Sequence, residues 1–365
     1  MDKRWFNNIE GARGYMSLWV YISHVVTFAT LALTKGIGLG NILADGNHAV
    51  VVFILMSGFV IERLLRRDEP YSNYILRRAF RLFPCYLVAL LISLMMLDFS
   101  KEVLENIPWY NVKNISRIHL IDEVDKNYWI HVVSHIFLLH GLIPDSIIPA
   151  TYTIMGQSWS LTLEWQFYLV APFLIGLIKS TVSKQKTFII LLLTLILFIS
   201  ASFFMRQDSF LPNYIAVFAA GYLTSILVET FTKENKFLYF YLFILIGIAL
   251  NTGGVLAAVP FAVWAVIIFS EVNSVKALDF IFSSKVALFF GRISYSFYCF
   301  HIIVIIFCSY ILISVIKITD QNMYAVSLIV SSFILTTIAS YLSYRYLEMP
   351  AMHYAKKKFA YKSNL

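Results

Sequence analysis

Ten apolar segments, each long enough to cross a lipid bilayer, constrain the fold of this chain more than any other feature. A membrane-spanning helix needs about 20 predominantly apolar residues. Hydrocarbon offers the backbone no water to bind, so such a segment satisfies its own hydrogen bonds by forming a helix. The sequence therefore predicts an all-α polytopic membrane protein with about ten transmembrane helices. The segments are residues 12–33, 47–65, 80–98, 158–179, 187–205, 212–230, 236–251, 253–270, 292–316 and 323–346.

The positions of Lys and Arg predict which way these helices run. Cytoplasmic loops of membrane proteins carry an excess of both residues. Placing both termini in the cytoplasm puts most of the 29 Lys and Arg residues on that side. Residues 129–142 form a shorter apolar stretch, and counting it as a full span would move most later cations outside. We therefore expect 129–142 to be a re-entrant or interfacial helix.

Charge and composition indicate one membrane domain. The net charge of +8 follows mainly from the predicted topology, and it also suits anionic lipid headgroups. No basic segment is interleaved with exposed aromatic residues, so a nucleic-acid partner is not expected. No linker rich in glycine, proline or serine divides the chain, which predicts one domain at residues 1–350 and a basic cytoplasmic tail at 351–365. Any chemistry must then come from the membrane helices, and the long outer loop 99–128 is expected to form part of a lid or acceptor surface.

Arg13 and His24 share the first apolar segment. Ionisable side chains are costly inside a membrane, so a helix that keeps two of them is a candidate functional element. Eleven residues at 100° per residue come to about 20° past three full turns, so both side chains lie on one face. They are about 16 Å apart along the helix axis. We expect Arg13 at the cytoplasmic surface and His24 near the middle of the bilayer.

Arg78 and Arg81 precede the third apolar segment and lie three residues apart, on one face of a helix. Guanidinium groups suit phosphates because they present paired donors. The alternative is that these arginines only set topology, because a cytoplasmic loop is expected to be rich in arginine.

Other ionisable residues lie in later segments. Glu164 is about 9 Å inside its segment, where it either orients an imidazole or an arginine or joins two helices. His301 lies among aromatic residues, which is typical of a hydrogen-bonded core histidine. His131 and His135 have a spacing that could bind a metal, but no nearby third ligand supports this, so we expect no metal site.

Six ordered segments carry a further pattern. They are Glu10-Gly11-Ala12-Arg13-Gly14 with His24, Phe53-Ile54-Leu55-Met56-Ser57-Gly58-Phe59, Arg78 with Arg81, Trp159-Ser160-Leu161 with Glu164, Ser294-Tyr295-Ser296-Phe297-Tyr298 with His301, and Glu348-Met349-Pro350. In this order they resemble the motifs of the acyltransferase family 3 integral membrane proteins. The resemblance extends from residue 9 to residue 350 and matches the stand-alone form, so residues 1–350 would form one acyltransferase domain.

The resemblance implies an O-acyltransferase of the bacterial inner membrane. Such a protein would move an acetyl group from cytoplasmic acetyl-CoA to a hydroxyl of a cell-envelope glycan. The acceptor class would be a lipid-linked O-antigen, capsule or exopolysaccharide unit. No permanently bound cofactor and no metal are expected.

The resemblance also suggests roles for individual residues. His24 would be the general base that activates the acceptor hydroxyl, although a covalent acyl-histidine step stays open. Glu164 would orient His24 or bind the acceptor. The residues expected to bind the donor are Arg13, Arg78 and Arg81, although Arg13 could instead pair with Glu10. The residues expected to bind the acceptor or support the site are Trp159, Tyr168, Tyr295 and His301.

The main alternative function is secondary transport. Ten spans with ionisable residues near the bilayer midplane also describe a proton-coupled transporter or flippase for a glycan or small solute. No internal repeat or matching pair of broken helices is visible in the sequence, which favours the enzyme.

Overall fold

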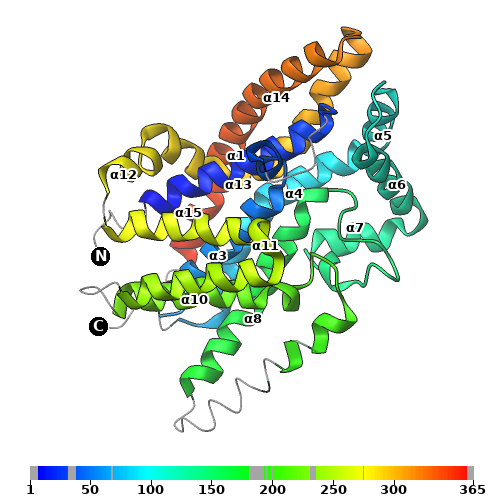
Figure 1. The fold of residues 1–365 in the computed structure, drawn as a ribbon. Helices are drawn as coiled ribbons and strands as arrows, with labels where there is room; N and C mark the ends of the chain where they lie inside the picture. The colour runs from blue at the N-terminus through cyan, green and yellow to red at the C-terminus, as the bar shows by residue number, and fades with distance from the viewer. Residues whose placement is uncertain are drawn as a thin grey trace.

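The computed structural model of this protein describes residues 7–31, 38–66, 69–180, 193, 196–198, 200–230, 236–273 and 275–359. Within these residues the chain is helical and contains no strand (Figure 1). The helices are α1 (Asn7–Phe28), α2 (Leu39–Leu43), α3 (Gly46–Leu64), α4 (Tyr71–Met95), α5 (Leu97–Asn106), α6 (Val112–Lys126), α7 (Tyr128–Ile136), α8 (Trp159–Ser180), α10 (Ile215–Thr230), α11 (Lys236–Asn273), α12 (Lys276–Phe282), α13 (Lys285–Tyr310), α14 (Gln321–Ser343) and α15 (Met349–Lys358).

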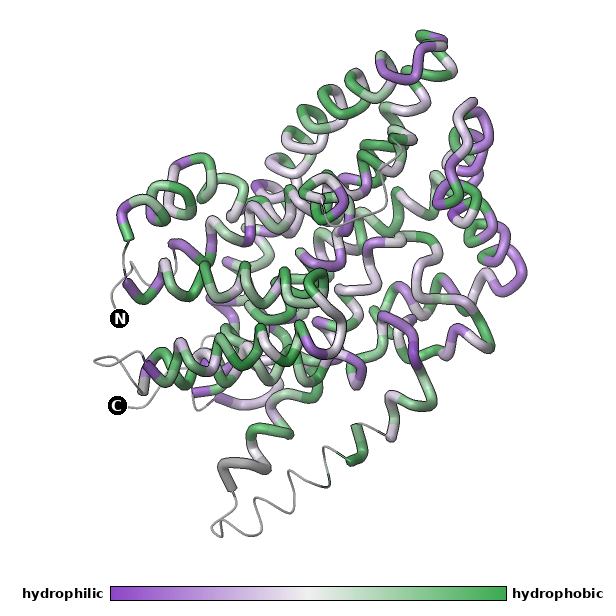
Figure 2. Tube along the Cα trace, viewed as in Figure 1, coloured by the Kyte–Doolittle hydropathy of each residue, from purple (hydrophilic) through white to green (hydrophobic). Residues whose placement is uncertain are grey.

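The prediction of an all-α polytopic membrane protein is confirmed. Six helical segments of the described chain are long and apolar enough to cross a membrane. They are Gly46–Leu64, Tyr71–Met95, Leu211–Glu229, Lys236–Asn273, Lys285–Val315 and Gln321–Lys358. Large apolar side chains on the outside of the bundle are exposed, for example Phe243 at 72% and Val326 at 63%. Figure 2 shows hydrophobic residues along the long helices, as expected of a surface that faces lipid.

The observed helices differ from the predicted segments in several places. Helix α1 begins at Asn7 and ends at Phe28, before the predicted 12–33, and neither α1 nor α8 is among the six candidate spans. Helix α4 begins nine residues before the predicted start, at Tyr71, because its first turns are polar and lack the hydropathy signal of a span. Of the predicted segment 187–205 the structure describes residues 193, 196–198 and 200–205, and the remainder lies outside the described residues. Part of the predicted tail at 351–365 is helical, because α15 continues α14 through a π-helical turn at Tyr344–Glu348.

Helix α11 contains both segments predicted at 236–251 and 253–270. Its two arms join at Gly254, whose φ of +70° is readily adopted only by glycine. The Tyr239 hydroxyl donates to Asn273 Oδ1 over 3.0 Å, although 34 residues separate them. A continuous helix would hold them about 51 Å apart, so the arms must fold back on each other.

Helix α7 covers the stretch predicted to be re-entrant or interfacial. It has 9 residues and is followed by a short 3-10 turn at His140–Leu142. At 1.5 Å per residue it is about 13 Å long, which is too short to cross a bilayer.

Loops that the predicted topology places on the same side of the membrane lie at the same end of the bundle. At one end Asn8 Nδ2 donates to Asp279 and Arg77 donates to the carbonyl of Phe359, so loops assigned to the cytoplasm contact one another. At the other end Asn111 Nδ2 donates to the carbonyl of Thr27. Helices α5 and α6 project from this second end (Figure 1). That the first end faces the cytoplasm stays a prediction.

Glycine residues let α1 lie close against α13. A Cβ atom on Gly291 would lie 2.2 Å from the Glu10 carbonyl oxygen, and one on Gly14 would lie 2.7 Å from the Gly291 amide nitrogen. Small residues that allow such backbone approach are typical of helix contacts in membranes. The contact fixes α1, which carries Arg13 and His24, against the helix that carries Tyr295, Tyr298 and His301.

Candidate functional site

Two cavities lie inside the bundle, one on each side of a wall that includes Val50 and Tyr298. The arginine cavity, about 150 Å³, is lined by Arg13, Arg78, Arg81, Glu164 and Tyr168 among others. The histidine cavity, about 460 Å³, is lined by His24, Trp159 and residues of α6 among others. Both cavities border α1, which therefore contributes Arg13 to one and His24 to the other.

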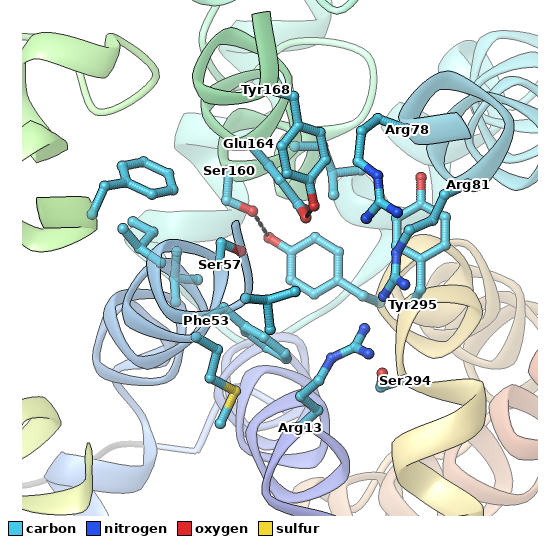
Figure 3. Close-up of a pocket in the computed structure, with 17 residues that line it drawn as sticks. Arg13, Phe53, Ser57, Arg78, Arg81, Ser160, Glu164, Tyr168, Ser294 and Tyr295 are labelled. Atoms are coloured by element: carbon cyan, nitrogen blue, oxygen red, sulfur yellow. Dashed lines mark hydrogen bonds between the residues drawn. The ribbon is translucent and has the colours of Figure 1, made fainter. Parts of the chain in front are cut away.

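Three guanidinium groups converge in the arginine cavity (Figure 3). Arg13 comes from α1, and Arg78 and Arg81 come from the amphipathic start of α4. Among the described residues none of the three forms a salt bridge. The cavity thus carries positive charge that Glu164, the carboxylate among its lining residues, does not neutralise by direct pairing.

Neighbouring arginines of the same loop region do have carboxylate partners. Arg66 Nε lies 2.7 Å from Glu62 Oε1, and Arg77 pairs with Glu69. Arg78 and Arg81 differ from these two in that they line a cavity and form no salt bridge among the described residues. The alternative in which Arg13 pairs with Glu10 is also absent from the described structure, because no such ion pair forms.

Glu164 lies in the arginine cavity beside Tyr168. The Tyr168 hydroxyl donates to Glu164 Oε1, and the Arg78 guanidinium lies 5.7 Å from the centre of the Tyr168 ring. Ser294 also lines this cavity, and its buried Oγ has no hydrogen-bond partner. These polar groups point into the cavity with the three arginines (Figure 3), where a polar ligand can contact them.

His24 faces the other cavity and lies next to His301. Their ring centres are 5.1 Å apart. His301 Nδ1 lies 2.8 Å from the Tyr298 carbonyl oxygen, which can only accept, so this nitrogen carries the hydrogen. His301 Nε2 then has a free lone pair and no partner in the described structure. His24 thus has beside it a second imidazole whose Nε2 has no hydrogen-bond partner.

Tyr298 holds the wall between the cavities. Its hydroxyl lies 2.6 Å from Ser160 Oγ and donates to the Gln157 carbonyl oxygen over 2.7 Å. Gln157 Nε2 in turn donates to the Cys299 carbonyl over 2.9 Å. These bonds tie the start of α8 to the middle of α13 and hold the Tyr298 side chain at the boundary between the two cavities.

The structure distributes the predicted site residues over the two cavities. Tyr168 and Tyr295 lie with Glu164 in the arginine cavity, whereas Trp159 lines the histidine cavity. Glu164 and His24 therefore face different cavities, and orientation of His24 by Glu164 has no support in this arrangement. His301, read from the sequence as a core histidine, is hydrogen-bonded as expected and also adjoins His24.

No role in the site was predicted for Tyr298, Ser160 or Ser294, although all three lie in the motif segments of the sequence. The only available signal for Tyr298 and Ser294 was their helical spacing from His301, which places them on adjoining faces of one helix. The long loop 99–128 was expected to form a lid or acceptor surface, and its helix α6 does line the histidine cavity.

His131 and His135 are buried for structural reasons. His131 Nδ1 lies 3.1 Å from Thr153 Oγ1, and the His135 ring stacks on His140 with centres 4.0 Å apart. Among the residues that the structure describes, no group of three His, Cys, Asp or Glu side chains could hold a metal ion.

The sequence matches the acyltransferase domain family, acyltransferase family 3, over residues 6–345. It is 27% identical over 173 residues to acyltransferase MdmB of Streptomyces mycarofaciens, covering 47% of this chain and 40% of that protein. It is 26% identical over 158 residues to the O-acetyl transferase of Shigella phage Sf6, covering 41% of this chain and 40% of that protein. The matched part thus spans about 40% of the length of each of these relatives. No solved structure matches this chain.

Proposed function

This chain belongs to the acyltransferase family, and we propose that it is a membrane O-acetyltransferase with acetyl-CoA as donor and a cell-envelope glycan as acceptor. The observation that carries the proposal is the pair of adjoining cavities. One has three guanidinium groups without a salt bridge among the described residues, and the other is lined by His24, whose ring adjoins that of His301. The name of the phage relative supports acetyl as the transferred group.

The arginine cavity suits the donor. The phosphates of CoA are anionic, and guanidinium forks bind phosphate oxygens through charge-assisted hydrogen bonds. At about 150 Å³ the cavity is small for a whole coenzyme. We propose that the phosphates bind at its cytoplasmic mouth and that the narrow pantetheine arm carries the thioester inward, towards Tyr298.

The histidine cavity suits the acceptor. Its volume of about 460 Å³ is within the usual range for small-molecule sites. Its lining combines the indole of Trp159, which offers a stacking face to a sugar ring, with the imidazole of His24. Asp45 and Asn47 lie exposed at its rim, so a bulky glycan can remain outside while one sugar enters.

His24 is the proposed general base. It accepts the proton of the acceptor hydroxyl as that oxygen forms a bond to the thioester carbonyl carbon. The carbon–sulfur bond then breaks, and the CoA sulfur leaves with the proton that His24 releases. His301 supports this step because its ring lies beside the His24 ring and its Nε2 has no hydrogen-bond partner in the described structure. Val50 and Tyr298 keep bulk water away from the thioester until the acceptor is bound.

The test is acetyl transfer by the purified protein in lipid nanodiscs. Labelled acetyl-CoA is supplied with a panel of envelope glycans, and both glycan-bound label and released CoA are measured. We expect both to rise together with at least one acceptor. A protein that transports a glycan across proteoliposomes, and neither acetylates any acceptor nor releases CoA, is a transporter and not this enzyme.

The inner-membrane location is part of the same proposal. The apolar helices support a multi-pass membrane protein, and the cation distribution supports cytoplasmic termini. Cysteine labelling of single-cysteine variants at position 101 and position 276 tests it. We expect labelling from outside the cell at 101 and from the cytoplasm at 276.

A further inference from the structure

Two cations of α6 border the histidine cavity. Lys113 and Arg117 are four residues apart, so their side chains lie on the same face of the helix. Lys113 is exposed and Arg117 is partly buried, which places one at the rim and the other further inside. The cavity therefore presents positive charge along the path to His24.

Arg117 is held in place without a carboxylate. Its Nη2 donates to the Ile154 carbonyl over 2.7 Å, and its Nη1 donates to the Tyr152 carbonyl. Carbonyl oxygens orient a guanidinium but do not cancel its charge. Burial lowers the pKa of Arg117 to about 10, with no acid opposing this effect. A buried cation without a counter-charge is costly and is rarely kept for packing alone.

The one carboxylate that lines the cavity does not neutralise this pair. Asp45 accepts from the Asn47 amide at the start of α3 and lies 3.7 Å from His48. Among the described residues neither Lys113 nor Arg117 forms a salt bridge. By contrast, Lys126 on the same helix pairs with Glu123, and Lys101 lies 2.6 Å from Asp122. The two cations of α6 that form no salt bridge among the described residues are thus the two that line the histidine cavity.

We propose that the histidine cavity selects an acceptor that carries an anionic group, a carboxylate or a phosphate, held by Lys113 and Arg117. This inference rests on the proposed function and names the substrate class of its acceptor site. The anion can belong to the sugar, as in a uronic acid, or to a phosphate that links the glycan to a lipid carrier. In either case the two cations fix the acceptor so that a hydroxyl faces His24.

Binding is measured without acetyl-CoA, so the result does not depend on catalysis. Two matched pairs of probes are titrated by calorimetry into the protein in nanodiscs of neutral lipid. The first pair is methyl glucuronide with methyl glucoside, and the second is a short-chain polyprenyl phosphate with the corresponding polyprenol. In at least one pair, we expect the anionic probe to bind at least about tenfold more tightly than the neutral probe. One charge-assisted hydrogen bond is sufficient for a difference of this size.

Variants assign this preference to the cavity. Lys113→Gln should remove most of the preference, and Lys113→Glu should reverse it. Lys113 is exposed, so these changes leave the core intact, and Lys126→Gln on the same helix is the matched control. Arg117→Gln, checked for folding by thermal melting, should also weaken binding of the anion. The pair that discriminates tells whether the charge lies on the sugar or on the carrier.

The proposal is wrong if neither anionic probe is preferred, or if Lys113→Gln and Lys126→Gln keep the same preference as the natural protein. Normal selectivity together with no acetyl transfer would instead count against the proposed function and leave the acceptor site standing. Acetyl transfer without a preference for either anionic probe would count against this proposal about the acceptor and leave the proposed function standing. The two failures are therefore distinguishable.

Discussion

Removing Arg78 or Arg81 should weaken the use of acetyl-CoA far more than the use of the acceptor. Both line the arginine cavity, and neither has a salt-bridge partner in the described structure. A hydrogen bond to a charged group is worth about 1.5–3 kcal/mol, which converts to roughly 13- to 160-fold in binding. We therefore expect Arg81→Ala to raise KM for acetyl-CoA by about one to two orders of magnitude, with KM for the acceptor nearly unchanged.

The effect of Arg78→Ala should differ slightly from that of Arg81→Ala. This variant also loses the contact of the Arg78 guanidinium with the Tyr168 ring at 5.7 Å, worth about 0.5–1 kcal/mol. Because Arg78 packs on Tyr168, part of its effect should appear as lower thermal stability. Lysine at position 78 or 81 keeps the positive charge but lacks the paired donors of the planar guanidinium group. The lysine variants should therefore bind acetyl-CoA more tightly than the alanine variants and more weakly than the natural protein.

The assay compares acetyl-CoA with acetyl-dephospho-CoA, which lacks the 3′-phosphate. If one of these arginines binds that phosphate, the natural protein should bind acetyl-dephospho-CoA more weakly than acetyl-CoA. The variant that lacks this arginine should bind the two donors with similar affinity. Arg77→Ala is the control, because Arg77 pairs with Glu69 and does not line the cavity. Equal donor dependence in all three variants and the natural protein would refute donor binding by Arg78 and Arg81.

Three further changes test the site and the fold. His24→Ala should lower kcat by about 10²- to 10⁴-fold while acetyl-CoA still binds, as measured by calorimetry, and a near-natural rate would exclude the general base. Tyr298→Phe removes two hydrogen bonds that hold the boundary between the cavities, so hydrolysis of acetyl-CoA in the absence of acceptor should rise, as measured by release of CoA. Unchanged hydrolysis would show that Tyr298 does not keep water from the thioester. Gly291→Ala places a Cβ 2.2 Å from the Glu10 carbonyl and should destabilise the protein by about 1–3 kcal/mol in thermal melting, whereas Gly247→Ala, which meets no atom within 4 Å, should not.

Sequence patterns predicted the features that depend on one helix at a time. Apolar segments gave the long helices, the short α7 and the two arms of α11, because length and hydropathy are local properties. Helical spacing placed Arg13 and His24 on one face of α1, and the structure keeps both facing cavities. The start of α4 was missed because helix formation outside the hydrocarbon leaves no hydropathy signal.

The division into two cavities depends on several helices at once and could not be predicted. Val50 from α3 and Tyr298 from α13 meet only in the folded bundle, and Tyr298 is fixed there by Ser160 of α8. Glu164 was weighed as a partner of His24 because both are ionisable and lie at membrane depth. Spacing along α8 says nothing of which neighbouring helix it faces, and the fold turns it towards the arginines.

In the proposed mechanism this division gives the two ends of α1 different tasks. Arg13 and His24 lie about 16 Å apart along one helix, too far for one small group to contact both directly. A donor held by its phosphates near Arg13 must therefore extend its acyl end along α1 towards Tyr298, and the acceptor must approach from the α6 side. Because α1 is locked against α13 by Gly14 and Gly291, the distance between phosphate site and base is set by rigid backbone. If the proposed donor is correct, transfer depends on the length of the pantetheine arm, and we expect an acyl group attached to CoA to be used in preference to a free acyl group.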